Sequence, residues 1–311
     1  MPQCLRPRRI INPRYKKIAR VSTETRIGSS RDSPISYRFV LNKFRSCVDF
    51  YIDVPCGLCL HCLKNRASDW RRRLLDEYEG LSPEQRARTL FVTMSIDPEH
   101  YDFVCSNPSR AIRLFLERVR KFKGRSVRHW FITERGDLNG RFHFHGVLFD
   151  CDIPFEMFYK LWKYGYIDVS VVRENKCMSY ITTYITKFIK TWFISKDEVQ
   201  KIYCSPGIGR SYVLDDRNFY WHRKGGILRF FTMSDNGYIT RLPRYYREWL
   251  FSERELYNYK LENYFKSFEL PSSPFVLGKR TYDSYPEYVK AVNDLGGHVL
   301  FSEKQIEFLC Q

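Results

Sequence analysis

The order of strand and helix patterns over residues 89–190 predicts an α+β fold, in which an antiparallel sheet carries helices packed on one side. Two observations lead to this class. Apolar runs of strand length alternate with helical segments in the order βαββαβα, and a polar loop with two glycines, residues 135–141, joins two of the strands as a hairpin would. At 311 residues, the chain is long enough for one large domain or two ordinary ones.

Each element of this unit has its own local pattern. A helix is expected over 63–79, before the unit begins, because Trp70, Leu74 and Tyr78 recur every four residues. Inside the unit, Ser106 or Asn107 is suited to cap the first helix. The expected elements inside the unit are a strand over 89–96, a helix carrying the apolar positions 112, 115, 116 and 119, strands over 129–134 and 142–149, a helix over 154–162, a strand over 166–171 and a helix over 176–190.

The flanking segments are less regular. Four prolines interrupt any helix before residue 53, where a single strand over 36–41 is expected, and beyond Cys204 only a strand near 227–233 and a helix near 244–263 are predicted. We therefore expect three segments, which are a basic arm with a cysteine-rich helical stretch (1–85), the α+β core (86–200) and a C-terminal extension (201–311).

The charge of the chain points to a polyanionic partner. Lys and Arg number 52 against 35 Asp and Glu, which gives a net charge of +17, and residues 1–46 alone hold twelve basic and two acidic side chains. The N-terminal segment is thus a candidate phosphate-contacting arm, and a solvated basic tail is the alternative. Aromatic residues make up 17% of the chain, which suits stacking on unpaired bases, although most of the rings must be core. The candidate DNA contacts are Arg8, Arg9, Lys16, Lys17 and Arg141.

The sequence contains no run of about 18 apolar residues and no signal-peptide h-region. We therefore expect a protein of a reducing cytosol, where ten cysteines argue for metal binding or free thiols rather than for disulfides. Cys56, Cys59 and Cys62 can supply three thiolates to one tetrahedral structural zinc, with Cys4 or His61 as the fourth ligand. Buried or free thiols are the alternative.

Two histidines, His143 and His145, lie one residue apart on an expected strand, so their side chains project from the same face. Neutral imidazole is a common metal ligand, and Glu134 would return toward His143 if residues 136–140 close a hairpin. Two imidazoles and one carboxylate suit Mn²⁺, Mg²⁺ or Zn²⁺ with positions left open for a substrate. A hairpin with surface histidines is the alternative interpretation.

The tyrosines Tyr180 and Tyr184, with Lys187 three residues further on, share one face of an expected helix. Such a stripe is more often core than catalytic when it stands alone. Next to a metal site it offers a hydroxyl for in-line attack on phosphorus, with the lysine available to stabilise the phenolate or the phosphate oxygens. We therefore expect these three residues to be catalytic.

Taken together, these stretches resemble the HUH endonuclease superfamily and, within it, the replication initiation proteins of gokushovirus-type microviruses, which are small single-stranded DNA phages. The matching motifs follow the family's order over roughly residues 4 to 250, and Phe142 stands where the family often has proline. They are Pro55-Cys56-Gly57-x-Cys59-x2-Cys62, Phe91-Val92-Thr93-Met94-Ser95, Glu134-x-Gly136 to Gly140-Arg141-x-His143-Phe144-His145, Leu161-Trp162-x2-Gly165, Tyr180-x3-Tyr184-x2-Lys187 and Pro206-Gly207-Ile208-Gly209.

The resemblance implies a metal-dependent, site-specific nick in single-stranded viral origin DNA, which leaves a 5′-phosphotyrosine and a free 3′-hydroxyl for a host polymerase. It makes His143, His145 and Glu134 the ligands of Mg²⁺ or Mn²⁺. Tyr180 and Tyr184 become nucleophiles that alternate to cut and rejoin circles, in an order the sequence leaves open. The implied location is the host bacterial cytoplasm. Because the chain has no recognisable P-loop, a host helicase is the expected partner for unwinding.

Two other functions remain open at this point. A non-catalytic single-stranded DNA- or RNA-binding protein would share the topology of an RRM-like sheet, but no strand has the expected aromatic RNP pattern and the histidine pair would be unexplained. A relaxase or transposase would use the same chemistry on plasmid or transposon-end hairpins.

Overall fold

The computed structural model of the chain describes residues 4–11, 39–41, 47–49, 51–136, 140–187, 191–233, 237, 239–256, 258–259, 275–277, 280–282 and 285–297. The chain divides into two compact units, a larger one spanning Leu63–Phe251 and a smaller one made of Pro2–Cys62 together with Ser252–Gln311. The division at residues 85 and 200 that the sequence suggests stays a prediction.

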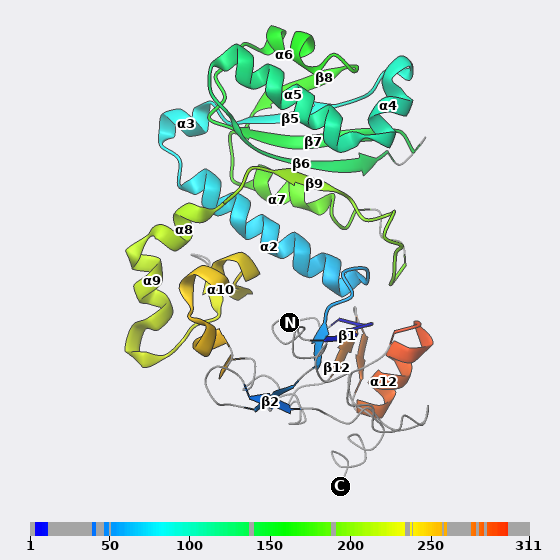
Figure 1. The fold of residues 1–311 in the computed structure, drawn as a ribbon, viewed down its shortest axis with the longest axis vertical. Coiled ribbons are helices and arrows are strands. Elements are labelled where there is room, and N and C mark those ends of the chain that lie inside the picture. Colours follow the sequence, from blue (N-terminus) through cyan, green and yellow to red (C-terminus); the bar gives the residue numbers. More distant parts are fainter. Residues whose placement is uncertain are drawn as a thin grey trace. The chain divides into compact units, whose positions relative to one another are not determined.

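A five-stranded antiparallel sheet forms the centre of the larger unit, with the strand order β8-β5-β7-β6-β9 (Figure 1). Its strands are β5 (Leu90–Met94), β6 (Arg128–Arg135), β7 (Phe142–Phe149), β8 (Ile167–Val171) and β9 (Ile202–Cys204). The first four strands and their helices follow the predicted order βαββαβα. Strand β9, which the sequence analysis missed, is only three residues long and pairs with β6 at the edge of the sheet. A strand that short carries no readable period-two pattern.

Helices cover both faces of this sheet, so the prediction of helices on one side is wrong. On one face lie α5 (Pro108–Lys123) and α6 (Phe155–Trp162), whose residues Phe115 and Trp162 meet edge to face with ring centroids 5.8 Å apart. The other face is covered by α2 (Leu60–Glu79) and α7 (Lys176–Thr183) (Figure 1). The central strands β6 and β7 bury side chains on both faces of the sheet, and a face lined with apolar side chains must be covered by another element.

Strand β7 shows how the alternation of side chains places the histidines. Phe144 and Leu148 point into the core beneath α5 and α6, whereas Val147 and Phe149 belong to the core beneath α2 and α7. Because successive side chains on a strand point to opposite faces, His143 and His145 both lie on the α7 face.

The helix boundaries depart from the predictions in two places. Asn107 precedes α5 as expected, but its side chain makes no capping hydrogen bond, and its carbonyl instead accepts from the N–H groups of Arg110 and Ala111 at 3.0 and 3.1 Å. Helix α7 ends at Thr183 rather than at residue 190, and turns continue to residue 187, after which residues 188–190 lie outside the described part.

Shorter elements complete the larger unit. They are α3 (Pro83–Ala87), η2 (Pro98–His100), α4 (Tyr101–Ser106), α8 (Arg210–Leu214), α9 (Asp216–Arg223), η3 (Lys224–Gly226), β10 (Phe231–Met233), β11 (Ile239–Arg241) and α10 (Arg244–Leu250). The strand expected near 227–233 corresponds to β10. The helix expected over 244–263 is interrupted at Phe251, which is extended with φ −124° and ψ 141°, and residues 260–263 lie outside the described part.

Two buried carboxylates connect α2 to the segments that follow the sheet. Asp76 accepts hydrogen bonds from Arg72 and from the hydroxyl of Tyr246 on α10 at 2.7 Å. Glu77 is paired with Arg128 at the start of β6 and accepts the Gly209 N–H at 2.7 Å. Buried charges are tolerated when they are paired in this way.

The described residues of the smaller unit include three antiparallel strand pairs and a ten-residue helix. The pairs are β1 (Arg8–Ile11) with β4 (Tyr51–Val54), β2 (Phe39–Leu41) with β3 (Cys47–Asp49) and β12 (Phe275–Leu277) with β13 (Arg280–Tyr282), and the helix is α12 (Tyr285–Asp294). Strand β2 covers the end of the strand expected over 36–41, whose first three residues lie outside the described part. Within the described ranges, no helix combines the length and the hydropathy that a bilayer span requires.

Candidate functional site

The hairpin β6–β7 brings the first candidate ligands together. Glu134 pairs with His143 across the two strands, and Ile132 pairs with His145. The connecting loop is closed by a hydrogen bond from the Gly136 N–H to the Arg141 carbonyl at 2.8 Å. The expected return of Glu134 toward the histidines is therefore confirmed.

The Glu134 carboxylate is buried and is held from both sides. One oxygen is bonded to His145 Nε2, and the other accepts from Lys187 Nζ at 2.8 Å. Burial alone would raise the pKa of Glu134, but the hydrogen bonds and positive charges of these two partners outweigh it, so the pKa lies below its ordinary value. At neutral pH the site therefore contains a carboxylate anion next to an imidazole.

The ring of His145 is oriented by a hydroxyl on the neighbouring strand. Thr93 Oγ1 lies 3.2 Å from His145 Nδ1, and the two residues are paired between β5 and β7. When Nδ1–H donates to the Thr93 oxygen, a neutral imidazole keeps its lone pair on Nε2, the atom that faces Glu134. Such a partner on the second ring nitrogen is typical of histidines that bind metals.

His143 is half-buried and shares the face of His145. Burial, followed by the charge of His145, lowers its pKa, so its imidazole is neutral at neutral pH and is available as a ligand. In the described part of the chain, His143, His145 and Glu134 do not form a group of three ligand atoms mutually within 4.8 Å. The donor types fit a divalent cation, while both oxygens of the carboxylate are engaged by His145 and Lys187.

The two tyrosines lie directly against this cluster. Their hydroxyl oxygens are 2.9 Å apart, and the ring of Tyr184 stacks on His145 with centroids 4.1 Å apart and planes 7° apart. Lys187 Nζ lies 5.1 Å from the Tyr184 ring centroid. The expected common face of Tyr180, Tyr184 and Lys187 is therefore present, although Tyr184 and Lys187 lie in the turns after α7.

Exposure distinguishes the two tyrosines sharply. Tyr180 is 54% exposed, whereas Tyr184 is 4% exposed. Burial, together with the hydrogen bond that the Tyr184 hydroxyl shares with Tyr180, raises the pKa of Tyr184 well above its ordinary value. The side chain of Tyr180 is therefore accessible to a substrate, whereas that of Tyr184 is buried against the ring of His145.

Three residues of this face were missed from the sequence. Thr93 contacts His145, and the ring of Phe91 lies 6.2 Å from that of His145 and 6.3 Å from that of Tyr180. Asp168 on β8 pairs with Thr93, is exposed, and alternates with the buried Ile167. The alternation within residues 167–171 could have indicated an acidic side chain on this face.

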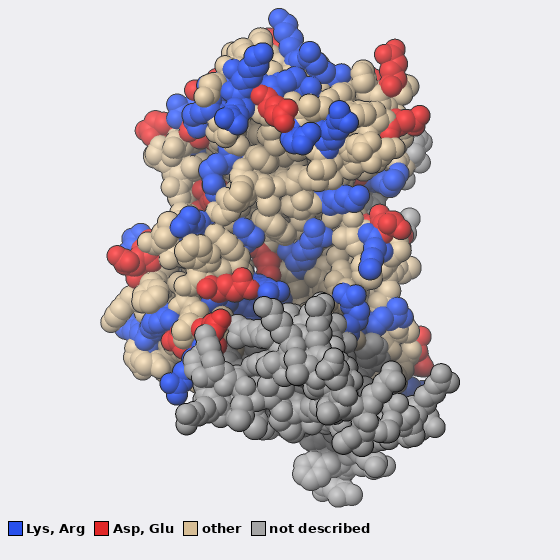
Figure 2. Space-filling view, in the orientation of Figure 1, with Lys and Arg blue, Asp and Glu red and all other residues tan. Residues whose placement is uncertain are grey.

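The candidate DNA contacts are only partly within the described residues. Arg8 is exposed, as is Arg141, which donates to the Ile96 carbonyl at 3.1 Å. Lys16 and Lys17 and the side chain of Arg9 lie outside the described part. Basic side chains also spread over the α5 region in Figure 2, in line with the exposed residues Arg110, Arg113, Arg120 and Lys121 of that helix.

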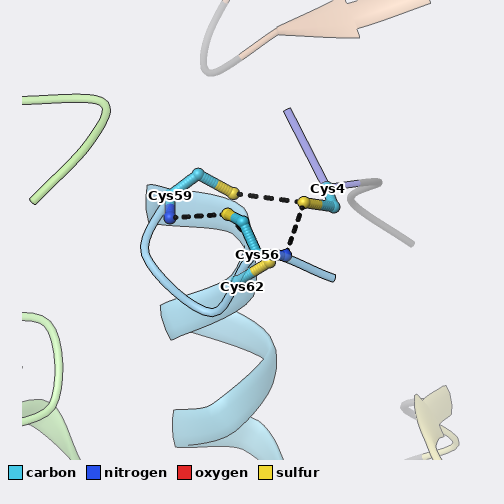
Figure 3. Close-up of side chains that lie close together, drawn as sticks. All are labelled: Cys4, Cys56, Cys59 and Cys62. Carbon is cyan, nitrogen blue, oxygen red and sulfur yellow. Dashed lines mark hydrogen bonds between the residues drawn. The ribbon is translucent and has the colours of Figure 1, made fainter. Parts of the chain in front are cut away.

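A separate cluster of cysteines lies in the smaller unit. Cys4, Cys56, Cys59 and Cys62 place their sulfur atoms within 4.8 Å of one another, so together they can hold a metal ion (Figure 3). The sequence left either Cys4 or His61 as the fourth ligand. In the structure, Cys4 is the residue that joins the other three cysteines.

Comparison with known proteins shows what the sheet and this face are similar to. Residues 89–189 match the family model of the replication-associated protein ORF2/G2P, a range that contains β5 to β8 and both tyrosines. Over 245 residues the chain is 21% identical to the replication-associated protein ORF4 of Chlamydia phage 1, which covers 68% of this chain and 57% of that protein. The expected resemblance to a microvirus-type replication initiator is thereby confirmed. The chain spans little more than half the length of this relative, and no solved structure gives a significant match.

Proposed function

We propose that the chain initiates rolling-circle replication by nicking and rejoining single-stranded origin DNA through a tyrosine nucleophile. The observation that carries this proposal is the meeting of an accessible phenol with a histidine–carboxylate–lysine cluster, on one face of a domain that matches replication-associated proteins. Cleavage of a phosphodiester needs a nucleophile and positive charge against the phosphate oxygens. This face offers both within a few ångströms.

Tyr180 is assigned the first cut because this residue is exposed while Tyr184 is buried. Its phenolic oxygen attacks phosphorus and loses its proton as the O–P bond forms. The bond from phosphorus to the 3′ oxygen breaks, and that oxygen takes up a proton to become the free 3′-hydroxyl. The products are a 5′-phosphotyrosine and a primer terminus.

Tyr184 is assigned the second cut, in which its oxygen attacks the phosphate of the regenerated origin and a new 3′-hydroxyl is released. That hydroxyl then attacks the phosphotyrosine on Tyr180, which rejoins the circle and frees the Tyr180 hydroxyl. The Tyr184 hydroxyl lies 2.9 Å from that of Tyr180, so either oxygen can attack a phosphate bound at the same position. Its raised pKa disfavours the phenolate, which explains why it does not compete for the first cut. A conformational change that exposes Tyr184 is a requirement of this assignment.

The proposed cofactor of this face is Mg²⁺ or Mn²⁺, held by His143, His145 and Glu134. When bound, the ion supplies positive charge against the non-bridging oxygens of the phosphate. Thr93 keeps the His145 ring in the orientation that turns Nε2 toward Glu134. Lys187 adds a cation whose side chain is 39% exposed, so that it can also neutralise a bound phosphate.

The proposed partner is single-stranded viral origin DNA, contacted by the basic residues Arg8, Arg9, Lys16, Lys17 and Arg141. The excess of basic residues in the whole chain supports an anionic partner of this kind. The free 3′-hydroxyl would be extended by a host polymerase, with a host helicase opening the duplex ahead of it. This places the protein in the cytoplasm of a bacterial host.

Adduct formation tests the proposal. The protein is incubated with circular single-stranded DNA of the genome that encodes it and with Mn²⁺ or Mg²⁺, and the products are separated on a denaturing gel. We expect a covalent protein–DNA adduct that is lost in Tyr180→Phe and in His145→Ala. Tyr159→Phe is the matched control, because Tyr159 is 49% exposed and lies outside this face.

The outcomes separate the competing functions. Tight, salt-sensitive binding without cleavage under any divalent metal would favour the non-catalytic single-strand-binding protein. Cleavage restricted to plasmid or transposon-end hairpins would favour a relaxase or transposase. An adduct that persists when both Tyr180 and Tyr184 are changed to phenylalanine would show that the nucleophile has been assigned wrongly.

A further inference from the structure

Four cysteines from two distant parts of the sequence meet in the smaller unit. Cys4 precedes strand β1 by four residues, whereas Cys56, Cys59 and Cys62 lie in the segment that leads from β4 into the first turn of α2. Three of the four side chains are buried and Cys4 is half-buried. Figure 3 shows their sulfur atoms turned toward one another.

The distances between the sulfur atoms match a metal-bound set and exclude disulfides in this arrangement. The Sγ atoms of Cys56 and Cys62 are 3.9 Å apart, and those of Cys4 and Cys59 are 4.0 Å apart. A disulfide requires about 2.05 Å between its sulfurs. A tetrahedron with zinc–sulfur bonds of about 2.3 Å has edges of about 3.8 Å.

Backbone N–H groups also point at these sulfurs. The Cys59 N–H lies 3.3 Å from Cys56 Sγ, the Cys56 N–H lies 3.2 Å from Cys4 Sγ, and the Leu5 N–H lies 3.5 Å from Cys59 Sγ. Such donors stabilise thiolates, which are the form that binds metal. Gly57 makes the tight turn between the first two ligands with φ +76°, a conformation that favours glycine.

We propose that Cys4, Cys56, Cys59 and Cys62 bind one structural Zn²⁺. Four thiolates form a soft, tetrahedral ligand set that suits zinc and leaves no position open for substrate. The ion is therefore structural, and it is independent of the divalent cation assigned to Glu134 and the histidines.

The position of the site gives it a specific structural role. In the antiparallel pair of β1 and β4, Arg8 pairs with Val54. Cys4 lies four residues before Arg8, and Cys56 lies two residues after Val54, so a shared ion closes the open end of this strand pair. The ion thereby reinforces the β1–β4 pair, whose other end, at Ile11 and Tyr51, leads into residues 12–50, a segment with nine Lys and Arg against three acidic residues.

The metal content of the purified chain tests the proposal. Protein prepared under reducing conditions is measured for zinc by elemental mass spectrometry, and we expect one ion per chain. Cys4→Ser should lower the zinc content at least tenfold. Cys105→Ser is the control: Cys105 packs against the core of the larger unit, away from the four cysteines in sequence, so this variant should retain the metal. His61→Ala should also retain it, which distinguishes the two fourth ligands that the sequence left open.

A cobalt titration of the unmodified chain keeps the test valid if Cys4→Ser fails to fold. After zinc is removed, Co²⁺ should produce the intense visible bands and sulfur-to-metal charge-transfer absorption of a tetrahedral tetrathiolate site, and zinc should abolish them. A folded chain without zinc, or a cobalt spectrum of octahedral type, overturns the proposal. Neither outcome depends on DNA cleavage, so the zinc site and the nicking reaction can fail separately.

Discussion

Replacing Gly146 by alanine should destabilise the sheet directly beneath the candidate site. Gly146 lies in β7 opposite Phe131 of β6, and a Cβ atom at this position would overlap the Phe131 ring. That ring is fully buried and packs edge to face on Phe115, with centroids 6.2 Å apart, so it cannot simply turn away. The strands must separate, or the ring must leave part of the core.

The size of the effect follows from these two routes. Overpacking a well-filled core costs about 1 to 3 kcal/mol, and partial exposure of a phenylalanine side chain costs up to about 3 kcal/mol. We therefore expect Gly146→Ala to lower the free energy of unfolding by about 2 to 4 kcal/mol. Urea unfolding followed by tryptophan fluorescence would report the change, because Trp130 lies in the same sheet.

A second glycine of the hairpin provides the matched control. A Cβ atom on Gly136 would meet its first neighbour, Cε1 of His143, at 3.5 Å, which is an ordinary van der Waals contact. Gly136→Ala should therefore change the free energy of unfolding by less than about 1 kcal/mol. Equal stabilities for the two variants would refute the reasoning about the Phe131 ring.

Three further predictions concern stability, pH and DNA binding. Glu77→Gln should lower the free energy of unfolding by about 1 to 2 kcal/mol in a urea titration, because it weakens the charge-assisted bond to Arg128. Burial lowers the pKa of His129 and of His222 below the ordinary value, so the unfolded chain takes up these protons first as the pH falls. The free energy of unfolding should therefore decrease below about pH 6.5, and NMR titration should give both rings midpoints below that value. Trp249→Ala should weaken single-stranded DNA binding about five- to a hundredfold in fluorescence anisotropy, since its indole is 50% exposed and available for base stacking.

Each of these predictions has a clear contrary result. Unchanged stability of Glu77→Gln would mean that the carboxylate charge adds nothing to the junction with β6. A titration midpoint above about pH 6.5 for either imidazole would reverse the sign of its contribution to the free energy of unfolding. The guanidinium carbon of Arg210 lies 4.7 Å from the centroid of the Trp249 ring. If Trp249→Ala binds DNA with unchanged affinity, this side chain does not belong to the binding surface.

Local patterns in the sequence predicted the hairpin and the meeting of its polar residues. The periods of residues 129–134 and 142–149 set which side chains share a face, and two glycines in a short connection brought Glu134 back to the histidines. The spacing of Tyr180 and Tyr184 likewise placed both phenols on one side of a helix. These features depend on residues that are neighbours in the chain.

Local sequence patterns could not predict features that depend on contacts between residues distant in the chain. The apolar stripe of Trp70, Leu74 and Tyr78 showed that the helix must be covered, but not which face of the sheet it would cover. The choice of Cys4 over His61 depends on a contact between segments about fifty residues apart. The contact between Thr93 and His145 requires the pairing of β5 with β7, which local periodicity does not specify.

Peptide mapping of the covalent adduct tests the central claim most directly. Adduct formed on circular single-stranded DNA with Mn²⁺ is digested with nuclease and protease, and the nucleotide-bearing peptide is sequenced by mass spectrometry. We predict a residual nucleotide on Tyr180 in the unmodified chain. A nucleotide on a residue outside this face, or DNA that is cut without any covalent peptide, would contradict the tyrosine mechanism.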